Sequence, residues 1–462
     1  MKKTFILLLL SALAFACNKK EEPSPEPQFK PYEPRISKPV VASIKVSGNT
    51  LNLKWSHDTK ENVKYVLKLN DVVYENPART FIQKVDYNTH FNGEIIAKYV
   101  NNQSTSAEFE FDTPKNKCLI IGTWSNTLYY IDLISKQVIW KCDTIYGSNN
   151  SIMIYKDLVL TTNASKIKAI DLVTGEIKWL VKPLPNSTMF ILQLIDSNKL
   201  YFRDYTYDQT IALNLDTKEI LWKSYRDGSP LALGDYIYIS NVFSGNTLVA
   251  LNKLSGDFVW GFDMDYNYTS LYGQISSQPV LYDNNLFFGD NIGRIYSVNA
   301  TTGIKNWSID MGQFISGKGA PVIYNGNLII PIQNAIKSIN TTSAGINWSY
   351  VNSYYINSSP FIYGNKIVAI GSYNGKSNVF VLDAETGKLL WSKEIDDGIN
   401  SSPVVYDGFI YFGSYNKKLY EIDLNSGEIT WQFTTNNVIT DSPIIVVGSG
   451  EEVIYPNIYG MN

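Results

Sequence analysis

The sequence predicts an all-β protein in which an eight-bladed β-propeller follows a small β-sandwich. Tryptophan recurs at intervals of 38 to 47 residues through the last three-quarters of the chain. A repeat of this length is typical of propellers and other arrays. Before the first repeat, short segments alternate apolar and polar residues, as half-buried strands do. Aromatic residues make up 13% of the 462 residues, which suits β-strands.

The tryptophans belong to a longer pattern. The repeat tryptophans are Trp140, Trp179, Trp222, Trp260, Trp307, Trp348, Trp391 and Trp431. Eight residues before them stand Asp132, Asp171, Asn214, Asn252, Asn299, Asn340, Asp383 and Asp423, each after an aliphatic residue. Glycine lies four residues before the tryptophan in five copies. Since Asp and Asn accept hydrogen bonds from turn amides and Gly adopts positive φ, the pattern predicts strand, turn and strand.

Each repeat is expected to form one blade. In the last full copy, residues 402–406 and 409–413 supply two more strands, giving a four-stranded antiparallel sheet. Such a sheet cannot bury both faces alone, so blades must stack, with the tryptophans between them. The first copy lacks an innermost strand, and residues 442–446 lack later ones. Pairing these two ends closes the ring. Residues 453–455 have no place in this scheme.

Residues 382–391, Leu-Asp-Ala-Glu-Thr-Gly-Lys-Leu-Leu-Trp, resemble the quinoprotein (PQQ)-like propeller repeat. The resemblance covers about 345 residues, within 115–462, and implies eight blades. Quinoprotein dehydrogenases are typically larger and carry an adjacent pair of cysteines over the cofactor. This sequence has no such pair, so no cofactor-binding residue carries over and no cofactor is expected.

The N-terminus predicts export. Lys2 and Lys3 precede an apolar run at residues 5–10, as in a secretory signal peptide ending at residue 16. Cys17 resembles the acylated cysteine of bacterial lipoproteins, although Phe15 departs from the usual motif. The alternative is an ordinary signal peptide with an incidental cysteine. Acylation, including palmitate, would anchor the protein to a bilayer without spanning it.

Residues 17–38 form a proline-rich tether that cannot bury a core. Glu21 and Glu22 resemble the surface-export signal of lipoproteins in Bacteroidota, although a solvated charge run is the alternative. The expected location is therefore the outer membrane, lipid-anchored, with exposure at the cell surface favoured over the periplasm.

Residues 39–113 predict a separate β-sandwich, because strand-like segments alternate with turn residues at short spacing. The segment resembles a fibronectin type III domain: Trp55 lies on the second strand, and residues 111–114 resemble the usual exit. Phe91 occupies the position where that family often has a corner tyrosine. A spacer role is expected for this domain.

Composition and motifs argue against catalysis. The only histidines, His57 and His90, lie in the sandwich, so the propeller has neither a Ser-His-Asp triad nor a His-ligated metal. A net charge of −3 without a basic cluster does not suit nucleic acid. No enzymatic activity, catalytic residue or metal site is expected.

Two carboxylate pairs, Asp263 with Asp265 and Asp396 with Asp397, are candidate calcium or acid–base sites. Asp263, Asp265 and Asn267 alternate as in a calcium loop, but Tyr268 and Gln274 stand where such a loop needs Gly and Glu. Residues 396 and 397 are both Asp and lack the spacing altogether. Solvated turn residues are favoured for both pairs.

The remaining cysteines, Cys118 and Cys142, are interpreted as separate thiols, because they fall on non-neighbouring strands. A disulfide, which export permits, is the alternative.

The loops that follow the tryptophan strands should gather at one end of the ring, and several are aromatic. The candidate binding face comprises Tyr146, Tyr266, Tyr268, Tyr272, Phe314, Tyr354 and Tyr355. Exposed rings beside amides suit both protein hot spots and stacking on sugars. Packing against neighbouring blades is the alternative role.

Among lipidated, eight-bladed, non-enzymatic proteins, the chain resembles outer-membrane protein assembly factor B proteins, but differs in its tether and sandwich. The resemblance implies a non-catalytic scaffold for envelope proteins, such as barrel-assembly or transporter components. A surface lipoprotein that binds polysaccharide is the second hypothesis, and a quinone-dependent dehydrogenase the third.

Overall fold

The computed structural model describes residues 35–47, 49–87, 89–124, 127–143, 152–163, 165–225, 230–233, 236–240, 247–264, 275–312, 319–448 and 450–456. The chain divides into two compact units. The first comprises residues 1–45, 51–83 and 91–111, and the second comprises residues 46–50, 84–90 and 112–462. The described part contains no helix with the length and apolar character needed to cross a bilayer.

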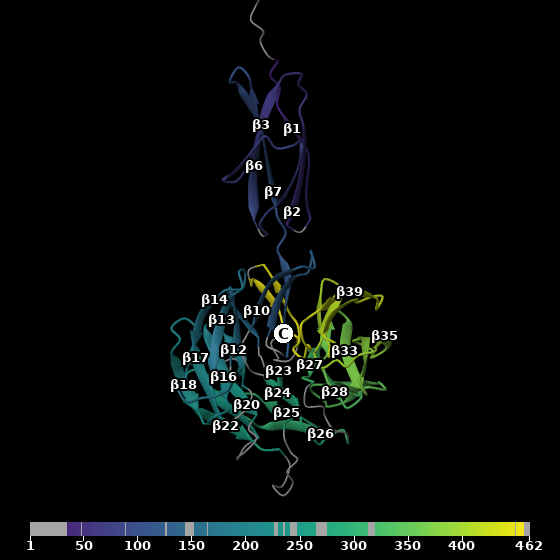
Figure 1. Cartoon of the computed structure of the whole chain (residues 1–462). Helices are drawn as coiled ribbons and strands as arrows, with labels where there is room; N and C mark the ends of the chain where they lie inside the picture. Colours follow the sequence, from purple (N-terminus) through teal and green to yellow (C-terminus); the bar gives the residue numbers. More distant parts are fainter. Residues whose placement is uncertain are drawn as a thin grey trace, which may run out of the picture. The chain divides into compact units, whose positions relative to one another are not determined.

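The first unit is a β-sandwich of seven strands (Figure 1). One sheet has the order β1 (Val40–Ser47), β2 (Thr50–Ser56) and β5 (Thr80–Lys84). The other has the order β4 (Val72–Glu75), β3 (Val63–Leu69), β6 (His90–Tyr99) and β7 (Ser104–Asp112). Trp55 on β2 meets Tyr65 on β3 edge-on, with ring centroids 6.2 Å apart. Alternate residues such as Leu53, Leu67 and Ile95 are fully buried, which explains the alternating sequence.

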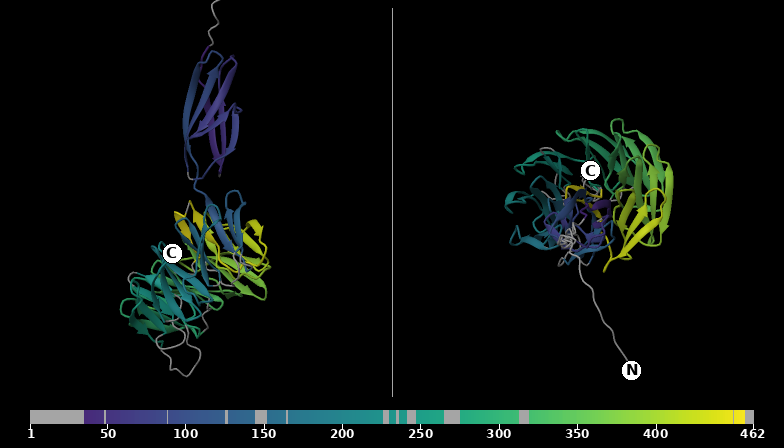
Figure 2. Two further views of the ribbon diagram at one scale, coloured as in Figure 1. Left: turned by 60° about the vertical axis from the view of Figure 1, so that its left-hand side comes forward. Right: turned by 90° about the horizontal axis from the view of Figure 1, so that it is seen from above.

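The second unit is a β-propeller of the predicted PQQ-like type, so the predicted fold class is confirmed. Its described strands form eight sheets, one for each repeat tryptophan, numbered here as blades 1 to 8. In the view from above, the blades follow one another in sequence order around a ring (Figure 2).

Blades 2 to 5 each have four antiparallel strands. Blade 2 contains β11 (Met153–Tyr155), β12 (Leu158–Asn163), β13 (Lys166–Asp171) and β14 (Ile177–Val181). Blade 3 contains β15 (Phe190–Asp196), β16 (Lys199–Asp204), β17 (Gln209–Asn214) and β18 (Ile220–Ser224). Blade 4 contains β19 (Pro230–Leu233), β20 (Tyr236–Ser240), β21 (Leu248–Asn252) and β22 (Phe258–Phe262). Blade 5 contains β23 (Val280–Tyr282), β24 (Asn285–Gly289), β25 (Arg294–Asn299) and β26 (Lys305–Asp310).

Blades 6 to 8 follow the same plan, except that the innermost strand of blade 7 is split in two. Blade 6 contains β27 (Val322–Tyr324), β28 (Asn327–Ile332), β29 (Ala335–Asn340) and β30 (Ile346–Val351). Blade 7 contains β31 (Tyr355–Ile356), β32 (Phe361–Tyr363), β33 (Lys366–Tyr373), β34 (Lys376–Asp383) and β35 (Leu389–Ile395). Blade 8 contains β36 (Val404–Tyr406), β37 (Phe409–Gly413), β38 (Lys418–Asp423) and β39 (Ile429–Thr434).

Blade 1 is assembled from both ends of this unit. It contains β8 (Lys117–Gly122), β9 (Thr127–Asp132) and β10 (Val138–Asp143), together with β40 (Ile444–Val447) and β41 (Glu452–Ile454). β40 pairs antiparallel with β8, with Ile444 opposite Ile120, as the sequence predicts for ring closure. β41 pairs with β40 and accounts for the strand-like segment left unassigned by the sequence. The Tyr455 hydroxyl accepts a hydrogen bond from the amide of Ile154, and this bond connects the hairpin to blade 2.

Each blade has two ends. Strands are counted from the innermost strand of each blade. At the turn end, strand 1 is joined to strand 2 and strand 3 to strand 4, except that strands 1 and 2 of blade 1, β40 and β8, are paired but not joined. At the tip end, a hairpin joins strands 2 and 3, and a loop leads to the next blade. At the turn end, all eight repeat Asp or Asn side chains accept hydrogen bonds from amides in their own turns, at 2.7 to 3.2 Å.

The repeat tryptophans join neighbouring blades at the turn end. The Trp260 indole Nε1 donates to the carbonyl of Ala300 in the next blade at 3.1 Å. Equivalent bonds run from Trp140, Trp222, Trp307 and Trp391 to the blades that follow them. Gly303, at φ +73°, lies against the Trp260 ring, and an added Cβ would come 2.6 Å from it. The repeat glycine therefore combines a positive φ with close contact to an indole.

Candidate interaction surface

The structure describes two of the predicted face residues. Tyr146, Tyr266, Tyr268, Tyr272 and Phe314 lie outside the described residues, as does Cys17. Both described residues, Tyr354 and Tyr355, lie on the tip end, in the loop that leads into blade 7.

The two tyrosines have different environments. Tyr354 packs its Cβ against Gly371, and its hydroxyl hydrogen-bonds to the Glu394 carboxylate, which raises the pKa of Tyr354. Tyr355 is 49% exposed and meets Tyr373 edge-on, with ring centroids 5.7 Å apart and planes at 64°. Tyr354 is thus held by its own blade, whereas Tyr355 presents its ring to solvent.

The sequence reasoning missed three further aromatic residues on the tip end of blades 1, 7 and 8, as well as the exposed Tyr205, Tyr207 and Tyr225 on the tip end of blade 3. Trp124, Tyr373 and Tyr415 are 54%, 51% and 48% exposed. They occupy hairpins between strands 2 and 3 of blades 1, 7 and 8, which are consecutive in the closed ring. We call Trp124, Tyr355, Tyr373 and Tyr415 the aromatic arc. A sequence signal did exist: Gly-Thr-Trp-Ser at residues 122–125, and Gly-Ser-Tyr-Asn at 371–374 and 413–416.

A belt of hydrogen bonds joins these hairpins to the loops beside them. The Ser372 hydroxyl donates to the carbonyl of Ile399 at 2.7 Å. The amide of Tyr415 donates to Gly398 O at 3.0 Å, and the amide of Ile439 donates to Ser414 O at 2.9 Å.

The belt continues into blade 1. The Trp124 amide donates to Val438 O at 2.9 Å, and the Asn436 side chain donates to the Thr127 hydroxyl at 2.9 Å. Hairpins and loops therefore alternate in one bonded series from blade 7 to blade 1, which fixes the backbone beneath the exposed rings.

Lys376, beside the arc, forms ion pairs, whereas Lys417 in the Tyr415 hairpin is exposed. Lys376 contacts Glu394 at 3.0 Å and Asp396 at 3.7 Å. The hydrogen bond from Tyr354 and the contact with Lys376 lower the pKa of Glu394, and the contacts with Glu394 and Asp396 raise the pKa of Lys376. Asp397 is buried and accepts a hydrogen bond from the amide of Asn416, in the next hairpin, at 3.2 Å, so the prediction of a solvated turn residue is wrong at this position. Of the other carboxylate group, Asp263 is exposed, while residues 265 and 267 lie outside the described residues.

His57 in the sandwich lies beside a serine, but the bonding is structural. Its Nε2 is 3.0 Å from Ser37 Oγ and 2.9 Å from Ser37 O, and its Nδ1 is 2.9 Å from the Tyr65 hydroxyl. The Ser37 hydroxyl donates to Asp58 O at 2.8 Å. Because that proton is already engaged by a carbonyl, His57 is not placed to take it as a general base.

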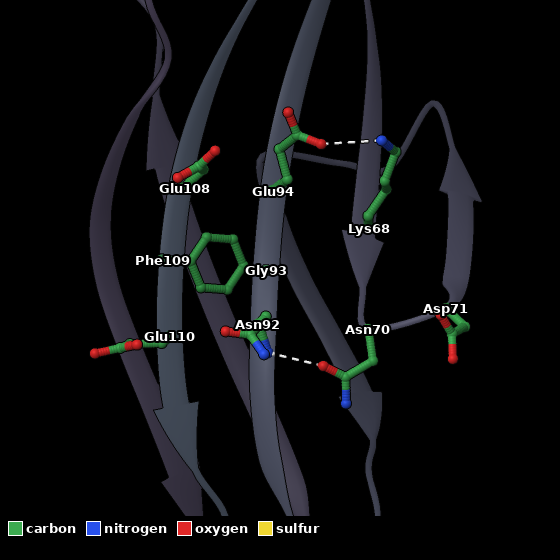
Figure 3. A pocket seen from close by; sticks show the side chains of 9 residues that line it. All are labelled: Lys68, Asn70, Asp71, Asn92, Gly93, Glu94, Glu108, Phe109 and Glu110. Carbon is green, nitrogen blue, oxygen red and sulfur yellow. Dashed lines mark hydrogen bonds and ion pairs between the residues drawn. The ribbon is translucent and has the colours of Figure 1, made fainter.

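A polar pocket of about 730 Å³ lies on the four-stranded sheet of the sandwich (Figure 3). Its lining includes Lys68, Asn70, Asp71, Asn92, Gly93, Glu94, Glu108, Phe109 and Glu110. Lys68 and Glu94 form an ion pair at 3.0 Å that lowers the pKa of Glu94. Within the described residues, no group of three or more His, Cys, Asp or Glu side chains is arranged to hold a metal ion.

Cys118 and Cys142 are both free thiols. Cys118 is fully buried on β8, and burial raises its pKa to about 12. A thiol in this environment is a poor nucleophile, because the reactive thiolate is disfavoured.

Comparison with known proteins places this propeller in a family. The model described as outer membrane protein assembly factor BamB matches residues 165–368 and 356–459, which is more than half of the chain. The chain belongs to the BamB family. Its sandwich lies before the matched residues.

Individual relatives of the BamB family are distant from this chain. BamB of Moranella endobia is 22% identical over 257 residues, covering 50% of this chain and 64% of that protein. A tetrathionate hydrolase of Acidithiobacillus ferrooxidans is 22% identical over 271 residues, covering 48% and 53%. The chain thus spans less than two thirds of either relative's length. The crystal structure of BamB from Moraxella catarrhalis has a TM-score of 0.52 and 17% identity, covers 66% of this chain and 94% of that chain, and supports the fold alone.

Proposed function

We propose that this protein is a non-catalytic, lipid-anchored scaffold of the outer membrane, whose propeller binds proteins of the cell envelope. The observation that carries the proposal is the BamB family match over the propeller, since BamB is described as an assembly factor of the outer membrane. The aromatic arc provides the propeller with a surface suited to a partner. Barrel-assembly components are the expected partners.

The proposed anchor is Cys17, acylated after removal of residues 1–16. Residues 17–38 would act as the tether, and the sandwich, predicted to be fibronectin type III-like, as a spacer before the propeller. A protein held by lipid chains and a long tether can reach partners near the membrane without spanning it.

The test is purification of the tagged, full-length protein from its native membranes in mild detergent, with co-purifying proteins identified by mass spectrometry. Barrel-assembly components in near-equal amounts are expected, and the Cys17→Ser variant should leave the membrane fraction. Cys118→Ser is the matched control, because that thiol is buried and takes no part in anchoring. Recovery of the wild-type protein alone would contradict the scaffold function.

A further inference from the structure

We propose that the aromatic arc is the surface through which the propeller binds a folded protein partner, chiefly through neutral polar and apolar contacts. This inference rests on the proposed scaffold function and adds to it the binding surface and the chemistry of recognition. It places the surface on the tip end of blades 7, 8 and 1, where Tyr373, Tyr415 and Trp124 are each about half exposed.

The composition of the arc matches protein recognition. The hairpins around Trp124, Tyr373 and Tyr415 consist mainly of Gly, Ser or Thr, Tyr or Trp, and Asn, with Lys417 in the last of them. The same residue types dominate antibody binding loops, because Tyr and Trp supply large contact areas at low entropic cost while Ser and Asn adapt their hydrogen bonds. Three such hairpins on consecutive blades form one surface from separate parts of the sequence.

The backbone of the arc is preorganised. Hydrogen bonds fix each hairpin to an adjacent loop, including those from the amides of Trp124 and Tyr415 and from the hydroxyl of Ser372. Inner loops are linked from blade to blade as well: the amide of Ser359 donates to Ser402 Oγ at 3.0 Å, and the amide of Ser402 donates to Ser442 Oγ at 2.8 Å. A partner that binds here orders side chains rather than loops, which lowers the entropic cost of binding.

Charge and ring geometry select among partners. Lys376 is paired with Glu394 and Asp396, and Lys417 in the Tyr415 hairpin adds one exposed positive charge, so these four groups together carry no net charge. Tyr355 and Tyr373 meet at 64° and form no common flat platform, whereas a sugar chain stacks best on rings that share one plane. A protein surface, which can fit side chains between tilted rings, is therefore favoured over a glycan.

Within the second unit, the arc lies at the end of blade 1 opposite to the start of β8. The chain enters blade 1 at Lys117, and β8 runs from there to Gly122 at the tip end. Trp124 follows at the far end of that strand, so the arc and the entry point lie at opposite ends of the blade.

The test is photo-cross-linking in the native cell. p-Benzoylphenylalanine replaces Tyr373, Tyr415 or Trp124 in the full-length protein. The matched controls are Tyr282 and Tyr363, which are 39% and 41% exposed but lie at the turn end. We expect adducts at the arc positions only, with the protein that co-purifies with the wild type. The double variant Tyr373→Ala/Tyr415→Ala should reduce co-purification at least tenfold, and Tyr282→Ala/Tyr363→Ala less than twofold.

The other outcomes are distinguishable. Adducts with the co-purifying protein at Tyr282 or Tyr363 alone would overturn the assignment of the surface while leaving the scaffold function intact. Adducts at the arc that periodate destroys and protease does not would identify a glycan and overturn the protein assignment. The absence of both adducts and a co-purifying protein would remove the scaffold function together with its surface.

Discussion

The two ends of the propeller blades differ in what the repeat keeps constant. At the turn end, all eight copies use an Asp or Asn turn, a residue with positive φ four positions before the tryptophan, and an indole at the blade junction. At the tip end, the described hairpins of blades 7, 8 and 1 carry Tyr373, Tyr415 and Trp124, that of blade 3 carries Tyr205 and Tyr207, and that of blade 5 has Asn291-Ile292-Gly293.

This difference separates stability from recognition. Neighbouring blades pack against each other through the repeat tryptophans in the same way at every junction, so substitutions at the turn end should destabilise the fold. The tip end is held by its own hydrogen bonds, so its exposed side chains are free to vary and to bind a partner. Substitutions there should alter binding with little effect on folding.

The largest expected effect comes from removing a junction indole. Trp260 is 8% exposed and donates to Ala300 O, which also accepts from the Tyr238 hydroxyl, so Trp260→Ala leaves a cavity and removes one of two hydrogen bonds to that carbonyl. We expect a loss of about 3–5 kcal/mol in the free energy of unfolding. Tyr415→Ala at the tip end, where the ring is 48% exposed, should cost about 1 kcal/mol or less. Urea unfolding of both variants provides the measurement, and equal losses would remove the distinction between the two ends.

Two glycines with the same backbone conformation give a closer comparison. Gly303 at the turn end and Gly375 at the tip end have φ of +73° and +75°. A Cβ at Gly303 would meet the Trp260 ring at 2.6 Å, whereas a Cβ at Gly375 has no neighbour within 4 Å. Alanine at either site costs about 1–2 kcal/mol for the left-handed conformation. We expect Gly303→Ala to cost about 1–2 kcal/mol more, because the indole must shift.

Other copies of the repeat already place a side chain at this position. Ala344 occupies the same position beside Trp307 at φ +58°, and Lys218 does so beside Trp179, with its Nζ 4.4 Å from the ring centroid. Trp179 and Trp307 are partly exposed, whereas Trp260 is buried beneath its glycine. Gly303→Ala should therefore fold, and its indole fluorescence should report greater solvent exposure. If Gly303→Ala and Gly375→Ala lose the same free energy of unfolding, close contact with the Trp260 ring does not add to the cost of the substitution.

The sequence predicted the structure of the turn end far better than that of the tip end. The spacing of Asp or Asn, Gly and Trp encodes local turns and strands, so the blade plan and the pairing of β40 with β8 could be derived from it. The arc could not be derived from the spacing, because Trp124 and Tyr415 lie far apart in the sequence and are brought to adjacent blades only by ring closure. Nothing in the sequence separates Tyr354 from Tyr355, because the bond from the Tyr354 hydroxyl to Glu394, on the outermost strand of the blade, forms only in the folded sheet.

A pH-dependent effect comes from a tip-end position where blade 1 departs from its neighbours. In blade 8, Ser401 Oγ accepts a hydrogen bond from the amide of Gly413 at 2.8 Å and donates one to the carbonyl of Gly413 at 2.9 Å. Asp441 holds the same position in blade 1, with its carboxylate against Gly122. Burial raises the pKa of Asp441 to about 7, opposed by a hydrogen bond from Thr440. An ionised carboxylate cannot donate to a carbonyl as serine does.

Because the folded-state pKa of Asp441 lies above its usual value of 3.8, the folded protein binds this proton more tightly than the unfolded chain. The resulting stability is fully present below about pH 4 and is lost as pH rises through about 7. We expect a loss on the order of 2 kcal/mol between pH 5 and pH 8.5, less than the full shift implies, because Asp441 keeps some contact with solvent. Asp441→Ser should abolish this loss, and Ser401→Asp should add a second one. Urea unfolding at both pH values measures the change, and an unaltered pH dependence in Asp441→Ser would show that another group carries it.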